Sequence, residues 1–577
     1  MWLIKRRVIA FFVCILFYLL YNLLAVMIYV YITKELRPFE TDIRDLCLAF
    51  FTLQKITYIF EDNANAIGAN AVGAETNAVG AETNTVGADT NTVGASFTSP
   101  NIFVKDYYNG TFDSDRLTVK SEVKRQLYNY LSTLTGKKLL WGTLTGIRPV
   151  NIVTSILEER ALLGEPVVAS LTSDRNIRDV MGLSPITEID HSIYKENESI
   201  KECLKKEYYI SDEKAYELIK IARNEIKILD RPELRNYKDS YSIYVGVPFC
   251  KSTCLYCSFT SFNIEKFGKY VDKYLETLER DFKGRVASIK GSQSSPLREG
   301  SPLHEHKLCP LTLYIGGGTP TSLDEESFER LLTIIDKYVD RSNCIEYTVE
   351  AGRPDTITRE KLLIMKRHGV SRISINPQSF NQKTLDLIGR KHTVKDVVEK
   401  FKLARDLGFD NINMDIILGL PNEHLFDVLK TLNGIRKLKP DSFTVHSLAL
   451  KRAARLNFEL ESWTKNYYLA GVAAREKEGK REIDKMFRWS ERLAEHLKLK
   501  SYYLYRQKNI AGNLENVGYA KEGKECIYNI MMMSERHSVY GFGTATTKEV
   551  FYENGGKRIE SEEGYKSVID YCERVGV

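Results

Sequence analysis

From residue 241 to residue 450 the chain alternates short apolar runs with longer amphipathic stretches. The apolar runs have the length of strands and lie at 243–247, 311–315, 345–350, 372–376, 412–417 and 441–448. Helical periodicity fills the intervals, for example at 264–284, 323–339 and 394–407, and Ser322 and Glu325 are expected to cap the second helix. This alternation predicts an α/β fold with a parallel sheet and right-handed crossovers. Six such units make a partial (β/α)6 TIM-like barrel, with its site at the C-terminal ends of the strands.

The segments on either side of this barrel region, 236–455, have a different character. A strand-like run at 28–32 and mostly helical sequence further on predict a smaller N-terminal α+β domain made of 27–60 and 115–235. Residues 456–577 are expected to form a mixed C-terminal domain.

A seven-residue repeat interrupts the N-terminal domain. Ala71-Val-Gly-Ala-Glu-Thr-Asn77 is echoed at 78–84 and 85–91. One Val and one Gly per repeat cannot form a coiled-coil seam. Residues 61–114 are therefore predicted to be a low-complexity disordered insertion.

The N-terminus admits two interpretations. The stretch 8–33 carries no charge and is long enough to span a bilayer, which would make 1–26 part of a membrane segment. Alternatively, because Met27 directly precedes the strand-like run, 1–26 is a hydrophobic extension or a mis-assigned start, and the working protein is cytoplasmic. We favour the second interpretation, and membrane association stays open.

Composition argues against a nucleic-acid-binding protein and against a disulfide-rich protein. The formal charge is +6 over 577 residues, and Lys and Arg are scattered, so nucleic acid is not expected as a partner. Three of the ten cysteines fall within eight residues and the others are dispersed. This pattern indicates a reducing compartment and one metal site, not a disulfide framework.

The three neighbouring cysteines are Cys250, Cys254 and Cys257, in the loop after the first barrel strand. Thiolates select iron–sulfur clusters, zinc or Cu(I), and a structural zinc site needs four ligands. Three thiolates on a [4Fe–4S] cluster leave one iron open to the amino and carboxylate groups of S-adenosylmethionine (SAM). A zinc knuckle completed by Cys309, Cys344 or a histidine stays open on spacing alone, as do three unpaired cysteines.

A glycine run follows the second strand, as Gly316-Gly-Gly-Thr-Pro320. Glycines let backbone approach a ligand closely and offer N–H and C=O groups to a zwitterion. Tight turns need glycine too. The position one strand after the cysteines makes the signal specific.

Together with the cysteines and this glycine run, Tyr244-Val-Gly-Val-Pro-Phe-Cys250 resembles the oxygen-independent coproporphyrinogen III dehydrogenase family of radical SAM proteins. Leu144-Thr-Gly-Ile-Arg-Pro149 and Tyr503-Leu-Tyr-Arg-Gln507 are similar to its HemZ-type branch in particular. The resemblance covers about 27–60 and 115–577. It implies a [4Fe–4S] cluster on the three cysteines, SAM, and a radical SAM core over the barrel.

The resemblance also implies SAM contacts near the strand ends. These are Tyr244, Tyr256, Gly317, Gly318, Thr319, Glu350, Gln378, Arg390, Asp415 and Ile417. Tyr256 is expected beside the adenine, Arg390 at the SAM carboxylate and Asp415 at the ribose. Each also has an ordinary structural interpretation: Glu350, for instance, as half of a buried pair and Ile417 as core. Their shared position near strand ends favours ligand binding.

The implied activity is oxidative decarboxylation of coproporphyrinogen III to protoporphyrinogen IX in heme biosynthesis, with a flavodoxin or ferredoxin as electron donor. Arg148, Arg353 and Arg506 are candidates for the substrate carboxylates. One departure is Phe259, where the well-studied dehydrogenases have another cysteine. The family also includes heme chaperones, so a heme carrier with His446 as candidate ligand stays open.

Overall fold

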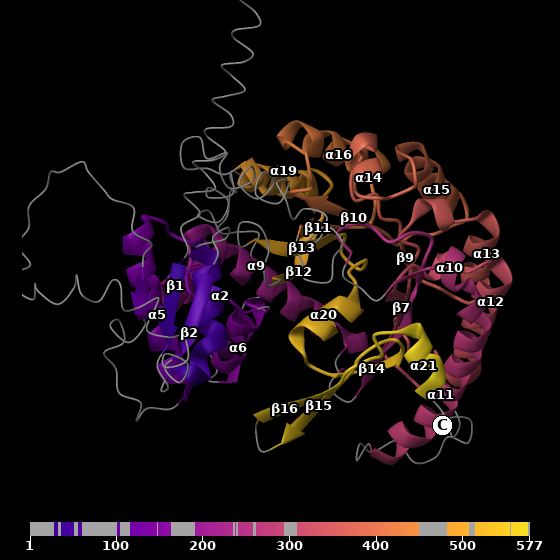
Figure 1. Cartoon of the computed structure of the whole chain (residues 1–577), viewed down its shortest axis with the longest axis horizontal. Helices are drawn as coiled ribbons and strands as arrows, with labels where there is room; N and C mark the ends of the chain where they lie inside the picture. Colours follow the sequence, from indigo (N-terminus) through magenta and orange to yellow (C-terminus); the bar gives the residue numbers. More distant parts are fainter. Residues whose placement is uncertain are drawn as a thin grey trace, which may run out of the picture. The chain divides into compact units, whose positions relative to one another are not determined.

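The structure, a computed structural model, divides into two units, 1–145 with 204–211, and 146–203 with 212–577 (Figure 1). It describes residues 28–32, 36–50, 56–60, 101–103, 116–146, 148–162, 191–234, 237, 240–257, 261–292, 308–448, 482–506, 514–553 and 556–574. The predicted extension 1–26, most of the predicted insertion 61–114 and Phe259 lie outside these residues. No helix within the described ranges is long and apolar enough to cross a membrane.

The first unit contains a small parallel sheet and two packed helices. Its strands are β1 (Ile28–Ile32), β2 (Ile56–Phe60) and β3 (Asn101–Phe103), in the order β2-β1-β3, and its helices include α2 (Glu40–Phe50) and α5 (Arg116–Thr135). Ile43, Leu46 and Leu131 belong to its buried core. The predicted strand at 28–32 is confirmed. The predicted insertion is corrected, because β3 lies within 61–114 and pairs with β1.

The second unit contains the predicted barrel. Six parallel strands stand side by side in the order β11, β10, β9, β8, β7, β4. They are β4 (Tyr241–Val247), β7 (Thr312–Gly317), β8 (Glu346–Glu350), β9 (Arg372–Ser374), β10 (Ile412–Leu418) and β11 (Ser442–Ser447). The helices between them include α11 (Val271–Ser292), α12 (Glu325–Tyr338), α13 (Arg359–Arg367), α15 (Val394–Asp406) and α16 (Leu425–Leu438), which form an outer row in Figure 1. All six strands and the α/β class are thus confirmed.

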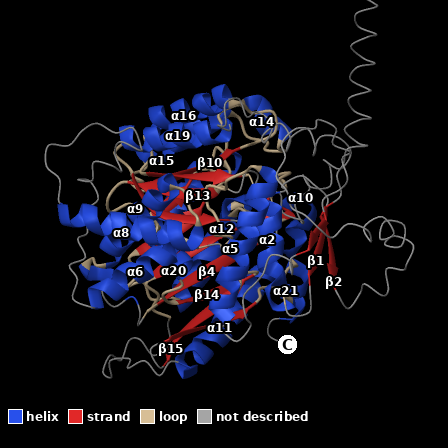
Figure 2. Ribbon diagram, turned by 90° about the vertical axis from the view of Figure 1, so that its left-hand side faces the viewer, coloured by secondary structure: helices blue, strands red, loops and turns tan. Residues whose placement is uncertain are grey.

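The C-terminal residues extend this sheet instead of forming a sheet of their own. They supply β12 (Lys500–Arg506), β13 (Glu515–Ala520), β14 (Ser538–Gly543), β15 (Thr547–Glu553) and β16 (Gly556–Glu562). β13 pairs with β11 at one edge and β14 with β4 at the other, which gives eleven strands (Figure 2). Helix α20 (Ile527–Ser534) lies between these two edges in Figure 1. Its Tyr528 and Met531 pack with Tyr314 of β7 and Val539 of β14, so α20 covers the inner face of the barrel.

The predicted N-terminal domain is also divided differently. Helices α6 (Val150–Leu162) and α9 (Asp212–Leu229) belong to the second unit, and α5 to the first. At α12 the cap is Asp324, whose side chain accepts a hydrogen bond from the backbone N–H of Ser327. The predicted cap by Ser322 is wrong, because Ser322 lies in a short 3-10 turn before that helix.

Candidate functional site

A cavity of about 650 Å³ lies within the second unit, along the inner face of the barrel. Its walls include every predicted cluster ligand and SAM contact, namely Cys250, Cys254, Cys257, Tyr244, Tyr256, Gly317, Gly318, Thr319, Glu350, Gln378, Arg390, Asp415 and Ile417. The volume is within the usual range for cofactor and substrate pockets. The predicted residues therefore surround one space.

The cysteine loop follows β4 and begins at Cys250. Cys250 and Cys254 are buried and Cys257 is half-buried. The backbone N–H of Cys257 donates to the carbonyl of Cys254 at 3.1 Å, and Cys250 Sγ lies 3.4 Å from Thr319 Oγ1. Burial raises the pKa of the Cys250 thiol to about 11, and the charges of the other two cysteines add to this effect. Three such thiolates need a cationic partner, as a metal cluster provides.

The donor set fits an iron–sulfur cluster better than a single ion. No three His, Cys, Asp or Glu side chains among the described residues stand close enough to hold one metal ion. A cubane binds each thiolate on a different iron, so its ligands need not converge on one point. The sulfurs of Cys309 and Cys344 lie near Asp340 Oδ2 (3.9 Å) and the Glu346 carbonyl (3.2 Å). These cysteines precede β7 and β8, at the opposite strand ends from the cysteine loop, so they do not complete a zinc knuckle.

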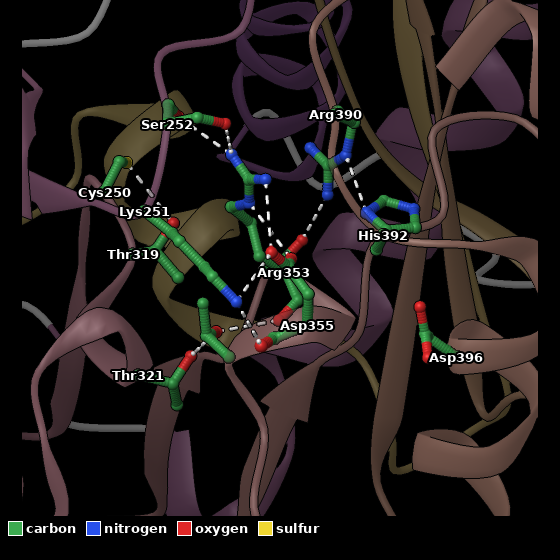
Figure 3. A network of polar contacts seen from close by, with 12 residues as sticks. Cys250, Lys251, Ser252, Thr319, Thr321, Arg353, Asp355, Arg390, His392 and Asp396 are labelled. Carbon is green, nitrogen blue, oxygen red and sulfur yellow. Dashed lines mark hydrogen bonds and ion pairs between the residues drawn. The ribbon is translucent and has the colours of Figure 1, made fainter. Parts of the chain in front are cut away.

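Arg353 braces the cysteine loop, as Figure 3 shows. Its Nη1 donates to the carbonyl of Ser252 at 2.8 Å and to Oγ of the same residue at 2.6 Å. Its Nε donates to Asp355 Oδ1 at 3.2 Å, and Lys251 Nζ lies 3.6 Å from the same carboxylate. Arg353 also lines the cavity, so its role in binding substrate stays a prediction. Arg506 is buried and is not among the residues that line the cavity, so the prediction that it binds substrate is corrected.

Arg390 is buried and joins three segments around the cavity (Figure 3). Its Nη2 donates to the carbonyls of Gly352 and Asn376 at 2.6 and 2.8 Å, its Nη1 to Tyr256 Oη at 3.2 Å, and its Nε to His392 Nδ1 at 3.4 Å. A guanidinium has five N–H groups. Four of them make the contacts above, and one N–H on Nη1 has no partner among the residues that the structure describes, so it is available to a ligand.

The glycine turn packs directly against the cysteine loop. Gly317 has φ +99°, and a Cβ on Gly318 would lie 2.5 Å from the carbonyl oxygen of Phe249, so both positions require glycine. The N–H groups of Gly318 and Thr319 donate to the carbonyls of Val247 and Phe249 at 2.7 Å each. The expectation that these N–H groups face a ligand is therefore wrong. The turn has only carbonyl oxygens left to offer.

Glu350 ends β8 beneath this turn. It accepts a 2.6 Å hydrogen bond from Tyr314 Oη and another from the backbone N–H of Gly317. Burial raises the pKa of the Glu350 carboxyl to about 7, although these two hydrogen bonds oppose the shift. Tyr314 stacks on Tyr244 with ring centroids 5.6 Å apart, and both stack on Tyr528 of α20. The carboxyl thus sits at the edge of an aromatic wall.

Gln378 and Asp415 lie on neighbouring backbone segments. Gln378 has φ +63°, its N–H donates to the carbonyl of Asp415 at 3.0 Å, and its Oε1 is buried without a partner among the described residues. A strained residue with an unsatisfied buried oxygen points to a bound ligand. Burial raises the pKa of Asp415, but His446, Asn413 and Thr444 lower it more, so this carboxylate stays ionised.

Ile417 belongs to a small apolar cluster against which Tyr256 packs. This cluster gives the cavity a flat apolar wall beside the cysteine loop.

Sequence reasoning missed the opposite wall of the cavity. Its residues come from α20 and the C-terminal strands and are Tyr503, Tyr505, Asn516, Tyr528, Asn529, Met532, Met533, Val539, Thr546 and Lys548. The run Met531-Met-Met533 was the available signal, because flexible apolar thioethers commonly line adaptable binding surfaces.

Comparisons with known proteins identify a superfamily and several relatives of this chain. The Radical SAM superfamily model matches residues 244–433. The oxygen-independent coproporphyrinogen-III oxidase-like protein HemZ of Bacillus subtilis is 35% identical over 80% of this chain and 78% of its own length. The heme chaperone HemW of the same organism is 36% identical over 36% of this chain and about half of its own length (51%). The solved structure of coproporphyrinogen III oxidase (HemN) from Escherichia coli aligns with 56% of this chain and 69% of its own, at 18% identity and a TM-score of 0.41.

Proposed function

The chain belongs to the oxygen-independent coproporphyrinogen III oxidase family of radical SAM proteins, and on this premise we propose that it decarboxylates coproporphyrinogen III oxidatively to protoporphyrinogen IX. The observation that carries the proposal is that one cavity joins the cysteine loop to a wall of tyrosines and methionines. Such a wall suits the apolar face of a tetrapyrrole, whereas a small polar substrate would leave it in contact with water.

The residues around the cysteine loop offer a group for each part of SAM. Cys250, Cys254 and Cys257 would hold the [4Fe–4S] cluster, and the bound cluster and SAM together supply the radical chemistry that removes hydrogen from the substrate. The carbonyls of the glycine turn and the Glu350 carboxylate are acceptors suited to an ammonium group. The remaining N–H of Arg390 is a donor suited to a carboxylate.

The nucleoside part of SAM would lie between two other features of the cavity. Tyr256 and Ile417 provide an apolar surface for the adenine. Asp415, held ionised by its neighbours, accepts hydrogen bonds from ribose hydroxyls. Each propionate that reacts would lose one hydrogen atom, CO₂ and one electron to become a vinyl group, so turnover also needs an external one-electron acceptor. A flavodoxin or ferredoxin would supply the electron for SAM cleavage, and we propose the cytoplasm as the location of this chemistry.

Product mass after anaerobic turnover tests the proposal. We expect the reconstituted protein with SAM, reductant and coproporphyrinogen III to release two carboxyl carbons per macrocycle. The measurement is mass spectrometry of the tetrapyrrole together with methionine release. SAM cleavage without loss of carboxyl carbons would contradict the proposed substrate.

A heme carrier is the second candidate. Two observations favour it: the similarity to HemW, which is named a heme chaperone, and the position of His446 on the cavity wall. His446 Nε2 lies 3.7 Å from Asp415 Oδ2, and its Nδ1 lies 3.4 Å from Tyr505 Oη. Stable heme binding without decarboxylation, lost in His446→Ala, would support the carrier in place of the enzyme.

Glu350 predicts a pH dependence of SAM binding. Its pKa of about 7 exceeds the ordinary 4.5, so its contribution to stability is present below pH 4.5 and is lost as the pH rises through 7. The SAM ammonium favours the ionised carboxylate, so SAM affinity should rise about tenfold between pH 6 and pH 8. Equilibrium dialysis should show this rise in the wild type and a flat profile in Glu350→Gln. A matching rise in the variant would remove Glu350 from the SAM site.

A further inference from the structure

A pair of cations lines the cavity wall that α20 and the β14–β15 hairpin build. Arg148, which precedes α6, and Lys548 of β15 both line the cavity. Both bind the carboxylate of Glu535, with Arg148 Nη1 at 2.8 Å and Lys548 Nζ at 2.7 Å from Oε1. Arg148 thus meets two residues from the C-terminal part of the chain at one carboxylate, on elements other than those that carry the cysteines.

The surroundings of Glu535 carry more positive than negative charge. Lys557 Nζ donates to the Glu535 carbonyl at 3.2 Å, and the neighbouring Arg536 binds Glu158. Burial lowers the pKa of Lys557, and so do the charges of Arg536, Arg148 and Lys548, while Glu535 opposes the shift. Four cations therefore face the carboxylates of Glu535 and Glu158, while burial raises the pKa of the nearby Glu225 carboxyl to about 8, so that this group adds little negative charge at neutral pH. An excess of this kind attracts anions to the cavity.

The two cations are partly exposed, and Arg148 has one N–H without a partner among the described residues. Arg148 has a side-chain exposure of 27% and Lys548 of 23%, so a ligand in the cavity can reach both. The Nε of Arg148 is buried without a hydrogen-bond partner among the described residues. An arginine with a free Nε can take a second carboxylate in the bidentate geometry that guanidinium groups favour.

We propose that Arg148 and Lys548 form a subsite for the carboxylates of an anionic macrocycle, and that Glu535 is the resident counter-ion with which those carboxylates compete. The identity of the ligand rests on the proposed function. Met532 and Met533 of α20 and Val539 of β14 also line the cavity and offer an apolar surface to the ring. The subsite would hold the propionates that do not react, and so would fix which propionates face the radical.

The probe for this subsite is coproporphyrin III, the coloured oxidised macrocycle with four propionates. Its binding to the full reconstituted chain is measured by the change in its absorbance, at low and high salt. We expect Arg148→Gln and Lys548→Gln each to raise the Kd roughly tenfold at low salt and to flatten its salt dependence. Lys521→Gln is the matched control, because it removes a lysine that is ion-paired with Asp441 and lies outside the cavity wall.

Glu535→Gln separates this subsite from a purely structural ion pair. Removal of the competing carboxylate should tighten coproporphyrin III binding severalfold. If the ion pair only maintained the structure, Glu535→Gln would break it and weaken binding as much as Arg148→Gln does. Unchanged affinity in both cation variants, or no binding by the wild type, would overturn the subsite even if turnover occurs. Binding that depends on Arg148 and Lys548, but with no carboxyl carbon lost, would uphold the subsite and overturn the proposed function.

Discussion

Cys254→Ala is expected to abolish the iron–sulfur chromophore and SAM cleavage together. Cys254 is buried on the cavity wall, and its carbonyl accepts the hydrogen bond from Cys257 that closes the loop. With two thiolates left, the cluster would lose a ligand that neither water nor alanine replaces, and metal affinity should fall by at least about 100-fold. Iron content, visible absorbance after anaerobic reconstitution, and release of methionine and 5′-deoxyadenosine are the measurements.

Cys309→Ala is the matched control for this prediction. Cys309 is another partly buried thiol of the second unit, but it precedes β7 and its sulfur lies near Asp340. This variant should keep the iron, the colour and SAM cleavage. Intact SAM cleavage in Cys254→Ala would refute the assignment of the cluster to the cysteine loop. Loss of iron in Cys309→Ala would reopen the zinc alternative.

The barrel strands were predictable because parallel strands buried on both faces appear as continuous apolar runs. The strand 243–247, for example, is observed within β4 (Tyr241–Val247), in which every residue except Tyr244 is buried. The C-terminal strands that extend the sheet at its two edges were not predictable in the same way. β14 pairs with β4, which lies about 300 residues earlier in the chain, and periodicity carries no information on the pairing partner. Residues 456–577 were therefore assigned to a separate domain.

In the candidate site, too, the residues could be predicted but their contacts could not. Glu350, Gln378 and Asp415 were predicted from the family resemblance, and topology supported them because the C-terminal ends of neighbouring parallel strands share one edge. The hydrogen-bond partners of these residues could not be predicted, because a hydrogen bond between distant segments leaves no local sequence pattern. Arg353, for example, donates to Ser252 of the cysteine loop, a contact that no local sequence pattern indicates.

Arg390→Ala is expected to weaken SAM binding strongly while the cluster stays in place. The substitution removes the one N–H available to the SAM carboxylate, and charge-assisted hydrogen bonds of this kind are worth about 1.5–3 kcal/mol. The Kd for SAM should therefore rise by at least about tenfold. The same change leaves the carbonyls of Gly352 and Asn376 without their donor, so the free energy of unfolding should fall by about 2–4 kcal/mol.

Arg405→Ala separates the two effects of the Arg390 substitution. Arg405 also donates to backbone carbonyls, those of Phe409 and Lys439, but it lies near Asp441 at the start of β11, away from the cavity. The Arg405→Ala substitution should lower the free energy of unfolding without raising the Kd for SAM. Arg390→Lys should not restore binding, because an ammonium cannot span four acceptors as the planar guanidinium does. Equal SAM affinity in Arg390→Ala and Arg405→Ala, by equilibrium dialysis at full iron occupancy, would show that Arg390 acts only as a brace.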